Sequence, residues 1–284
     1  MKLYTINTGH FKLDGGAMFG VVPKSLWNKA NPADDNNMCS WALRCLLIVD
    51  GNRKILIDNG MGNKQDEKFF GHYYLHGNDT LEKSLFNYGY TPDDITDVFL
   101  THLHFDHCGG SIKRENDKLV PAFKNATYWS SAKHWNAALH PNDREKASFL
   151  KENILPIEES GKLRFVETTD GEEWAPNIRI RYVNGHTDSM MLPQINNNGT
   201  QILYCADLLP SIHHLPMPWV MAYDMRPLET MNEKKRLLAE AVAGNWVLFF
   251  EHDPINECCS LQKTDKGVRL KTTFALKDIQ NHIL

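Results

Sequence analysis

The stretch Thr101-His102-Leu103-His104-Phe105-Asp106-His107-Cys108-Gly109-Gly110 decides how this sequence is interpreted. It places three histidines and one aspartate within six residues, directly after the apolar segment 97–101. Alternate residues of an extended chain share a face, so His102 and His104 can reach one point together, and a turn can aim Asp106 and His107 at a second point. Neutral imidazole is the commonest metal ligand, and imidazole with carboxylate suits zinc, iron or manganese. The stretch therefore predicts a metal site rather than a polar loop with unrelated histidines.

Three polar residues further along the chain are candidates to complete this site. His186, Asp207 and His252 each follow an apolar, strand-like run, where a sheet delivers side chains to a common edge. Taken alone, a residue of this type is more often an ordinary surface or core residue than a metal ligand. Together with the cluster they make seven candidate ligands, which is too many for one tetrahedral ion with four ligands. The sequence therefore predicts two metal ions.

The order of these residues resembles a known family. The motif H-x-H-x-D-H at 102–107, then Gly185-His186, then Asp207 closing a strand, then His252, resembles the metallo-β-lactamase superfamily. The turn Ile57-Asp58-Asn59-Gly60 is similar to that superfamily's early Leu-Ile-Asp-x-Gly element. The resemblance implies an α/β (α+β) fold, a four-layer αββα sandwich with the site at one edge.

The resemblance also implies which residue does what. Three histidines would bind the first metal, namely His102, His104 and His186. The second metal would be bound by Asp106, His107 and His252, and the Asp207 carboxylate would bridge both. The cofactor implied is two divalent metal ions, with zinc expected and iron or manganese as alternatives.

Such a centre predicts a hydrolytic mechanism. Two metals about 3.5–4 Å apart hold a bridging water and lower its pKa toward about 7, which supplies hydroxide at neutral pH. The hydroxide would attack a carbonyl or phosphoryl centre, with Asp106 and Asp207 as the catalytic carboxylates and Asp106 moving a proton. Asp58 is a candidate partner for a ligating imidazole, or else a residue that stabilises its own turn.

Within the superfamily, the run Asp14-Gly-Gly-Ala-Met-Phe-Gly-Val-Val-Pro23 resembles the acyl-homoserine lactonase and methyl parathion hydrolase branch. Two departures stand against a lactonase. The second Gly-His of the usual Gly-His-Thr-x-Gly-His is missing after Thr187, and Pro210 stands where lactonases of this kind have a tyrosine. His213, His214 or Tyr223 could supply a polar group instead, or be ordinary loop residues.

The substrate class is inferred from apolar side chains in loops. These are Met18, Phe19, Val21, Val22, Trp27, Met217 and Trp219. They could line a pocket for a small neutral substrate, namely an ester, a lactone or a phosphotriester. They could equally form a homodimer contact or a flap over the core. The competing functions are an RNase Z-like or other phosphodiesterase and a glyoxalase II-like thioester hydrolase.

The composition of the chain indicates which classes of binding partner are expected. The net charge of −4 and the absence of a basic excess disfavour nucleic acid, so a small-molecule substrate is expected. No apolar run approaches the roughly 20 residues of a membrane span, and residues 1–9 lack the apolar h-region expected of a secretory signal. A cytoplasmic location with six reduced cysteines follows as the expectation. Without a linker or repeat, residues 1–284 are expected to form a single metallo-β-lactamase-like domain.

Periodicity and turn residues predict the elements in outline. A hairpin is expected from 44–49 and 54–58, and helices over 79–88, 131–139, 143–153 and 231–243. Further strands are expected at 97–101, 126–129, 163–166, 178–183, 201–205, 246–250 and 267–273. Strands that occur both in hairpins and between helices predict two mixed sheets.

Overall fold

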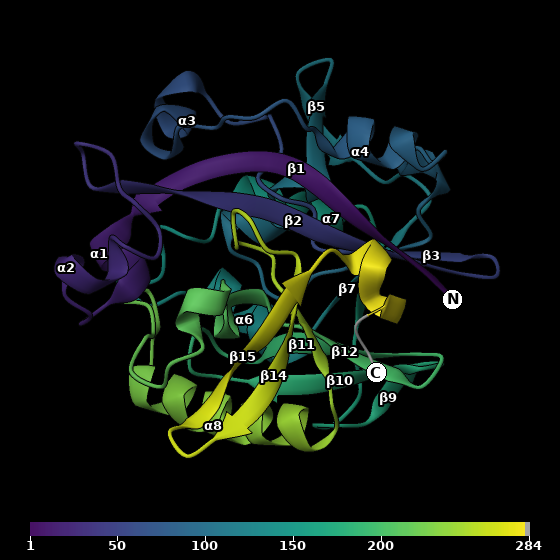
Figure 1. The fold of residues 1–284 in the computed structure, drawn as a ribbon. Helices are drawn as coiled ribbons and strands as arrows, with labels where there is room; N and C mark the ends of the chain where they lie inside the picture. Colours follow the sequence, from purple (N-terminus) through teal and green to yellow (C-terminus); the bar gives the residue numbers. More distant parts are fainter. Residues whose placement is uncertain (282–284) are drawn as a thin grey trace. The chain divides into compact units, whose positions relative to one another are not determined.

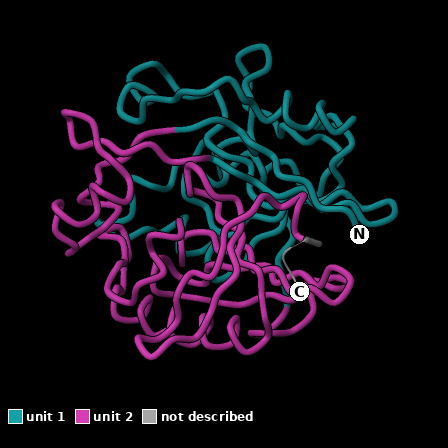
Figure 2. The backbone as a smooth tube through the Cα atoms, in the orientation of Figure 1, with its two compact units in different colours: residues 1–10, 43–167 teal, residues 11–42, 168–284 magenta. Residues whose placement is uncertain are grey.

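The computed structural model describes residues 1–281. Contacts between Cα atoms divide the chain into two compact units (Figure 2). Unit 1 comprises residues 1–10 and 43–167, and unit 2 comprises residues 11–42 together with the chain from 168 onward. The single domain expected from the sequence stays a prediction.

A six-stranded mixed sheet is formed by the early strands. Its order is β1 (Lys2–Asp14), β2 (Met38–Asp50), β3 (Arg53–Ile57), β4 (Asp97–Phe99), β7 (Thr127–Ser130) and β8 (Leu163–Phe165). The expected hairpin is confirmed, since β2 pairs with β3 in the register Leu46↔Ile57. Strands β3, β4, β7 and β8 are parallel, so their carboxyl ends lie at one edge of the sheet. The metal-ligand candidates of unit 1 follow β4 at that edge.

A seven-stranded sheet belongs to the later part of the chain. Its strands in sequence are β9 (Glu173–Ala175), β10 (Ile178–Val183), β11 (Met190–Asn197), β12 (Thr200–Tyr204), β13 (Val247–Phe249), β14 (Cys258–Thr264) and β15 (Gly267–Phe274). Neighbours pair antiparallel except β12 and β13, which are parallel in the register Tyr204↔Phe249. The long helix α8 (Pro227–Ala243) packs against β14 and β15 (Figure 1). The two mixed sheets predicted from the sequence are confirmed.

The remaining elements connect these strands. A two-stranded sheet pairs β5 (Ile112–Glu115) with β6 (Lys118–Pro121). The other helices are α1 (Gly15–Phe19), α2 (Lys24–Trp27), α3 (Glu67–Tyr73), α4 (Leu81–Asn87), α5 (Phe105–Cys108), α6 (Ala132–Leu139) and α7 (Lys151–Glu159). Among the described residues, no helix combines the length and the apolar character that crossing a membrane requires.

The helix predicted over 143–153 is wrong for most of its length. The Asn142 side chain accepts the backbone N–H groups of Arg144 (3.0 Å) and Glu145 (3.1 Å), which forms a local turn instead. Short polar side chains of this kind compete with helical hydrogen bonds. The helix α7 begins only at Lys151. Strand β11 is missing from the expected strands, and its Pro193 pairs with Ile180 within the sheet, although proline is usually confined to edge strands.

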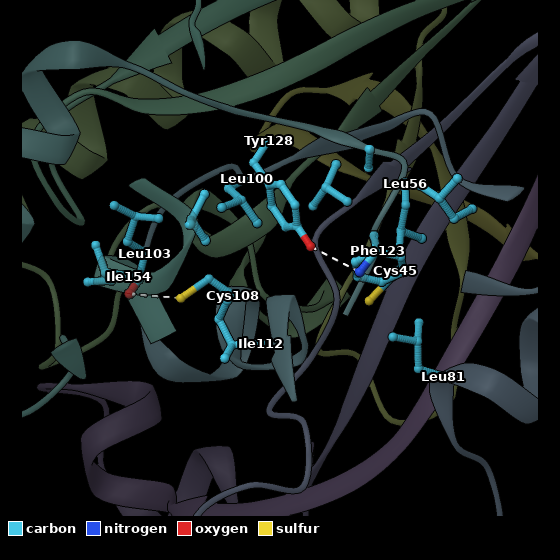
Figure 3. Packing of buried hydrophobic residues seen from close by; sticks show 14 of the residues in the cluster. Cys45, Leu56, Leu81, Leu100, Leu103, Cys108, Ile112, Phe123, Tyr128 and Ile154 are labelled. Atoms are coloured by element: carbon cyan, nitrogen blue, oxygen red, sulfur yellow. Dashed lines mark hydrogen bonds between the residues drawn. The ribbon is translucent and has the colours of Figure 1, made fainter. Parts of the chain in front are cut away.

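The core of unit 1 surrounds the aromatic ring of Tyr128 (Figure 3). Its hydroxyl donates to the Ser111 carbonyl (3.0 Å) and accepts the Phe123 N–H (3.1 Å). All six cysteines are buried free thiols, as the sequence predicts. Burial raises the pKa of the Cys108 thiol to about 12, so this residue packs as an apolar group.

We expect Tyr128→Phe to lower the free energy of unfolding by about 1–3 kcal/mol, because it leaves a buried N–H and a buried C=O without the hydroxyl. Urea unfolding followed by far-UV circular dichroism measures this. Tyr74→Phe, on a ring that is half exposed, is the control and should change stability by less than about 0.5 kcal/mol. Equal effects at the two positions would contradict the structural role of the Tyr128 hydroxyl.

Candidate metal centre

In unit 1 the site begins with the carboxylate of Asp58, just after β3. Asp58 Oδ1 accepts the N–H of Thr101 (2.8 Å), and Asp58 Oδ2 accepts the hydroxyl of Thr101 (2.6 Å). The Asp58 backbone N–H in turn donates to the Phe99 carbonyl at the end of β4 (2.9 Å). Asp58 is fully buried and has a φ of 54°. A residue of this kind in the left-handed region points to a constrained local role, here the anchoring of the histidine cluster.

The residue between the first two histidines fixes the directions of both. Leu103 points into the hydrophobic core of unit 1, and its carbonyl accepts the Cys108 thiol (3.3 Å; Figure 3). Its backbone N–H donates to His134 Nε2 (2.8 Å). Because side chains alternate, His102 and His104 turn away from this core together, and their ligand atoms lie within 4.8 Å of each other. The structure thus brings these two histidines together within unit 1.

Each of the three histidines of the H-x-H-x-D-H motif has one ring nitrogen in contact with an oxygen atom. The contacts are His102 Nδ1 with Thr101 Oγ1 (3.0 Å), His104 Nε2 with Glu145 Oε1 (3.1 Å) and His107 Nδ1 with Asp58 Oδ2 (3.1 Å). The Thr101 hydroxyl donates its own proton to Asp58, so all three oxygens accept from the imidazoles. The tautomers follow: the lone pair of a neutral ring is on Nε2 of His102 and His107 and on Nδ1 of His104.

Asp106 lies on the one-turn helix α5, next to His107. Its Oδ2 is 3.8 Å from His107 Nε2, the nitrogen that carries the lone pair. Both side chains are buried. The structure therefore places these two candidate ligands together in unit 1, with a carboxylate oxygen beside an imidazole nitrogen.

The turns at 59–62 and 107–110 pack backbone against backbone behind these ligands. The Asn59 N–H donates to the His107 carbonyl (2.9 Å), and the Gly110 N–H donates to the Gly60 carbonyl (3.0 Å). A Cβ atom on Gly110 would lie 2.2 Å from the Asn59 carbonyl oxygen. Only glycine fits there, which explains why the H-x-H-x-D-H motif runs into a glycine pair.

In unit 2 the three remaining candidates meet at one carboxylate. His186 follows β10, Asp207 lies in a short 3-10 turn after β12, and His252 follows β13. Asp207 Oδ2 is 3.1 Å from His186 Nε2, and Asp207 Oδ1 is 3.1 Å from His252 Nε2. The parallel pairing of β12 and β13 brings Asp207 and His252 to the same sheet edge. One carboxylate thus has one oxygen on each of two imidazoles, which is the arrangement expected of a bridging ligand.

The far nitrogens of these two histidines are also held. His186 Nδ1 donates to Asp224 Oδ1 (3.0 Å), and His252 Nδ1 donates to the Ala42 carbonyl (2.8 Å). Both imidazoles therefore direct Nε2 toward Asp207. As in unit 1, an oxygen acceptor fixes the tautomer of each candidate ligand, a feature of metal-binding histidines.

The helix α8 fixes the backbone before His186. Glu233 accepts the N–H groups of Asn184 (2.6 Å) and Gly185 (3.1 Å). A Cβ atom on Gly185 would lie 2.3 Å from the Thr230 backbone nitrogen, so a larger residue would push the helix away. The Gly-His pair read from the sequence thus has a steric reason.

The surroundings of His186 favour a positive charge. Burial lowers the pKa of this imidazole, but the carboxylates of Asp207 and Asp224 raise it to about 10 overall. A proton on Nε2 and a metal ion are alternative positive charges for the same position. The candidate donors are imidazole nitrogens, each ring oriented by an oxygen at its other nitrogen, and carboxylate oxygens, and this set fits a divalent cation.

Sequence reasoning missed three residues that hold the candidate ligands or the backbone between them. Glu145 and Asp224 contact the candidate ligands His104 and His186, and His134 accepts the N–H of Leu103. No motif marks them, because each is far along the chain from its partner. A second prediction, that Asp58 holds a ligating imidazole, agrees with its contact to His107.

The apolar N-terminal residues lie in the core rather than on an open wall. Met18, Phe19 and Trp27 are almost fully buried, and only Val21 is exposed among the segment 18–22. The Phe19 ring stacks on Trp27 (5.5 Å between centroids) and on His214 (5.0 Å). Of the alternatives that the sequence allowed for these three residues, the core interpretation is the one that the structure supports.

The three residues that could replace the lactonase tyrosine, His213, His214 and Tyr223, differ in burial and in their contacts. His214 is buried, its Nδ1 contacts Ser211 Oγ (2.9 Å), and its Nε2 contacts the Met18 carbonyl (2.9 Å). Burial lowers its pKa to about 3, so it is neutral and structural. His213 is half-buried and Tyr223 is exposed, so these two remain the candidates for a polar group that takes the place of the lactonase tyrosine.

Known proteins are similar to this chain over most of its length. The relative named N-acyl homoserine lactonase AiiA, from Bacillus thuringiensis subsp. kurstaki, is 27% identical over 265 residues, which covers 89% of this chain and 93% of the relative. The solved structure of a probable metal-dependent hydrolase from Staphylococcus aureus superimposes with a TM-score of 0.87 at 29% identity and covers 96% of each chain. AidC, described as a dizinc quorum-quenching lactonase, superimposes with a TM-score of 0.76 at 23% identity over 96% and 95% of the two chains, which shows a shared fold.

The family itself is decided by the match of residues 44–252 to the profile of the metallo-beta-lactamase superfamily. That range contains all seven candidate ligands, from His102 to His252. The chain belongs to the metallo-β-lactamase superfamily and is a hydrolase with that fold.

Proposed function

We propose that this protein uses a dinuclear metal centre to cleave a small, neutral, ester-like substrate, namely an ester, a lactone or a phosphotriester. The observation that carries the proposal is the Asp207 carboxylate, which has one oxygen 3.1 Å from His186 Nε2 and the other 3.1 Å from His252 Nε2. A carboxylate in this position suits a pair of ions better than one, because each oxygen has an imidazole partner of its own.

The proposed ligand sets follow the motif residue by residue. The first ion takes His102, His104 and His186, the second takes Asp106, His107 and His252, and Asp207 binds both. Support comes from the tautomers described above, since the nitrogen opposite each oxygen contact is the one that a metal would take. Zinc is the metal that we propose, with iron and manganese as the other ions that suit these donors.

Bound divalent ions supply Lewis acidity to the substrate oxygen and lower the pKa of water. The residues of the chain do the rest. Asp106 is placed beside His107 to accept a proton from the nucleophile and return it to the leaving group. Asp58 and Asp224 hold the imidazoles of His107 and His186 in one tautomer, so that neither ring has to reorient during turnover.

A neutral substrate is supported by the side chains next to the ligands in unit 1. Phe105 lies between His104 and Asp106, and its ring packs against Phe69 (5.4 Å between centroids) and Tyr73 (4.7 Å) of α3. Such rings contribute apolar contact area at about 25 cal/mol per Å² buried. The relatives named N-acyl homoserine lactonase support a lactone, whereas Pro210 in place of the lactonase tyrosine favours simpler esters and phosphotriesters. A homodimer, a cytoplasmic location and the absence of a nucleic-acid partner stay predictions.

Metal content is the first test. Protein purified from cells grown with ample metal should contain close to two equivalents per chain, with zinc expected, because seven ligands exceed the four that one tetrahedral ion needs. Elemental analysis by mass spectrometry measures this on the same preparation that is assayed. A folded preparation that is fully active without any metal would overturn the proposed function.

The candidate carboxylates give the second test. Asp106→Asn and Asp207→Asn should each lower kcat by roughly 10²–10⁴-fold or more, because general acid–base groups contribute in that range and both charges help neutralise the ions. Their unfolding midpoints in urea should change far less. Asp265→Asn, in an exposed turn, controls for the loss of one negative charge and should retain full activity. Unchanged turnover in a fully metallated Asp106→Asn protein would remove Asp106 from the mechanism.

The substrate class gives the third test. In a panel of aryl ester, lactone, thioester, phosphotriester, phosphodiester and RNA, the neutral substrates should have higher kcat/KM than the phosphodiester or RNA. If Pro210 matters, lactones should be poorer than aryl esters or phosphotriesters. The same panel run with Asp106→Asn excludes a contaminating esterase. If a phosphodiester or RNA gave the highest kcat/KM, a phosphodiesterase function would replace the one proposed.

A further inference from the structure

Glu145 is a buried carboxylate that the predicted ligand set does not use. It is 5% exposed, and its Oε1 is 3.1 Å from His104 Nε2. Its other oxygen, Oε2, accepts the Asn142 amide (3.1 Å). Both oxygens therefore have donors, and the side chain is held at both ends.

The turn that carries Glu145 is fixed by Asn142. The Asn142 side-chain oxygen accepts the backbone N–H groups of Arg144 and Glu145, while its nitrogen donates to the Glu145 carboxylate. One side chain thus fixes both the backbone and the carboxylate. The turn takes the place of the first part of the helix that the sequence predicts over 143–153. In this turn the Glu145 carboxylate reaches His104 Nε2.

The same segment contacts His104 on other sides. The Phe105 N–H donates to the Ser148 carbonyl (3.0 Å), and the Phe149 ring lies 4.9 Å from the His104 ring, centroid to centroid. Residues 142–149 therefore hold the backbone just after His104, one face of its ring and its Nε2. A backbone hydrogen bond, an aromatic contact and a carboxylate of this segment therefore all restrain His104.

We infer that Glu145 is a positioning residue for His104, which it fixes in the tautomer that presents Nδ1 to the first metal ion. The inference rests on the proposed function, because it assigns to Glu145 a role toward an ion of that centre. A carboxylate that accepts the N–H of a ligating imidazole also raises the basicity of the ligand. Burial of the carboxylate is favourable when its donor is positively polarised, as an imidazole is when its other nitrogen binds a cation.

The test uses Glu145→Gln, which keeps the shape and one acceptor oxygen but loses the charge, and Glu145→Ala, which loses both. Loss of such an outer partner costs about 10–100-fold in metal affinity. We expect that loss for one of the two equivalents, smaller for Gln than for Ala, in competition with a chromophoric chelator. In cobalt-substituted protein, the visible absorption of one site should change while the other persists.

The matched control is Asp143→Asn, which removes one negative charge from the same turn on a side chain that is 98% exposed. It should leave both affinities and the cobalt spectrum unchanged. Asn142→Ala is a second route to the same effect, because it releases the carboxylate without altering it, and it keeps the test open if Glu145→Ala does not fold.

Three outcomes would overturn the inference. Wild-type affinity for both ions in folded Glu145→Gln and Glu145→Ala would exclude a positioning role. A loss of urea stability in the chelator-stripped proteins with normal metal affinity would make Glu145 structural only. If the wild type itself bound no metal, the proposed function would fail and this inference with it, whereas two ions in the wild type with unaffected variants would leave the proposed function standing.

Discussion

The arrangement of the candidate centre in unit 1 depends on the carboxylate of Asp58. Its two oxygens accept the N–H and the hydroxyl of Thr101, and Oδ2 also accepts Nδ1 of His107. One side chain thus connects the end of β3, the second residue after β4 and the helix α5. Because the Thr101 hydroxyl is committed to Asp58, it can only accept from His102, and the tautomer of that histidine follows. A single fully buried group therefore sets the direction of two candidate ligands.

The same principle recurs in unit 2 with different groups. An imidazole has two nitrogens, and whichever donates to a protein oxygen leaves the other as the electron-pair donor. Asp224 makes that choice for His186, and the Ala42 carbonyl makes it for His252. The backbone beside Asp207 is constrained as well, since Ala206 has a φ of 40°, a region that costs of order 1–3 kcal/mol for residues other than glycine. The fold tolerates that cost next to the carboxylate that lies between His186 and His252.

The candidate ligands could be predicted from the sequence, but most of the residues that hold them could not. The candidate ligands within residues 102–107 are close together in sequence, and the later three each follow an apolar run, so a linear pattern predicts them. Glu145 and Asp224 are 41 and 38 residues from the histidines that they hold, and nothing in their local sequence marks them. The helix predicted over 143–153 was wrong for a related reason, because Asn142 redirects the backbone through side-chain hydrogen bonds that periodicity does not register. The core role of Met18, Phe19 and Trp27 was equally open, since an apolar side chain looks the same in a pocket wall and in a core.

Buried carboxylates in each unit need compensating positive charge. In unit 1, Asp58, Asp106 and Glu145 are buried beside the candidate ligands His104 and His107. In unit 2, Asp207 and Asp224 are buried on either side of His186. Buried negative charges are costly unless positive charges compensate them. If the proposed ions bind, Asp58, Glu145 and Asp224 would do more than orient the rings, because their negative potential would favour a divalent cation over a proton at the candidate ligands.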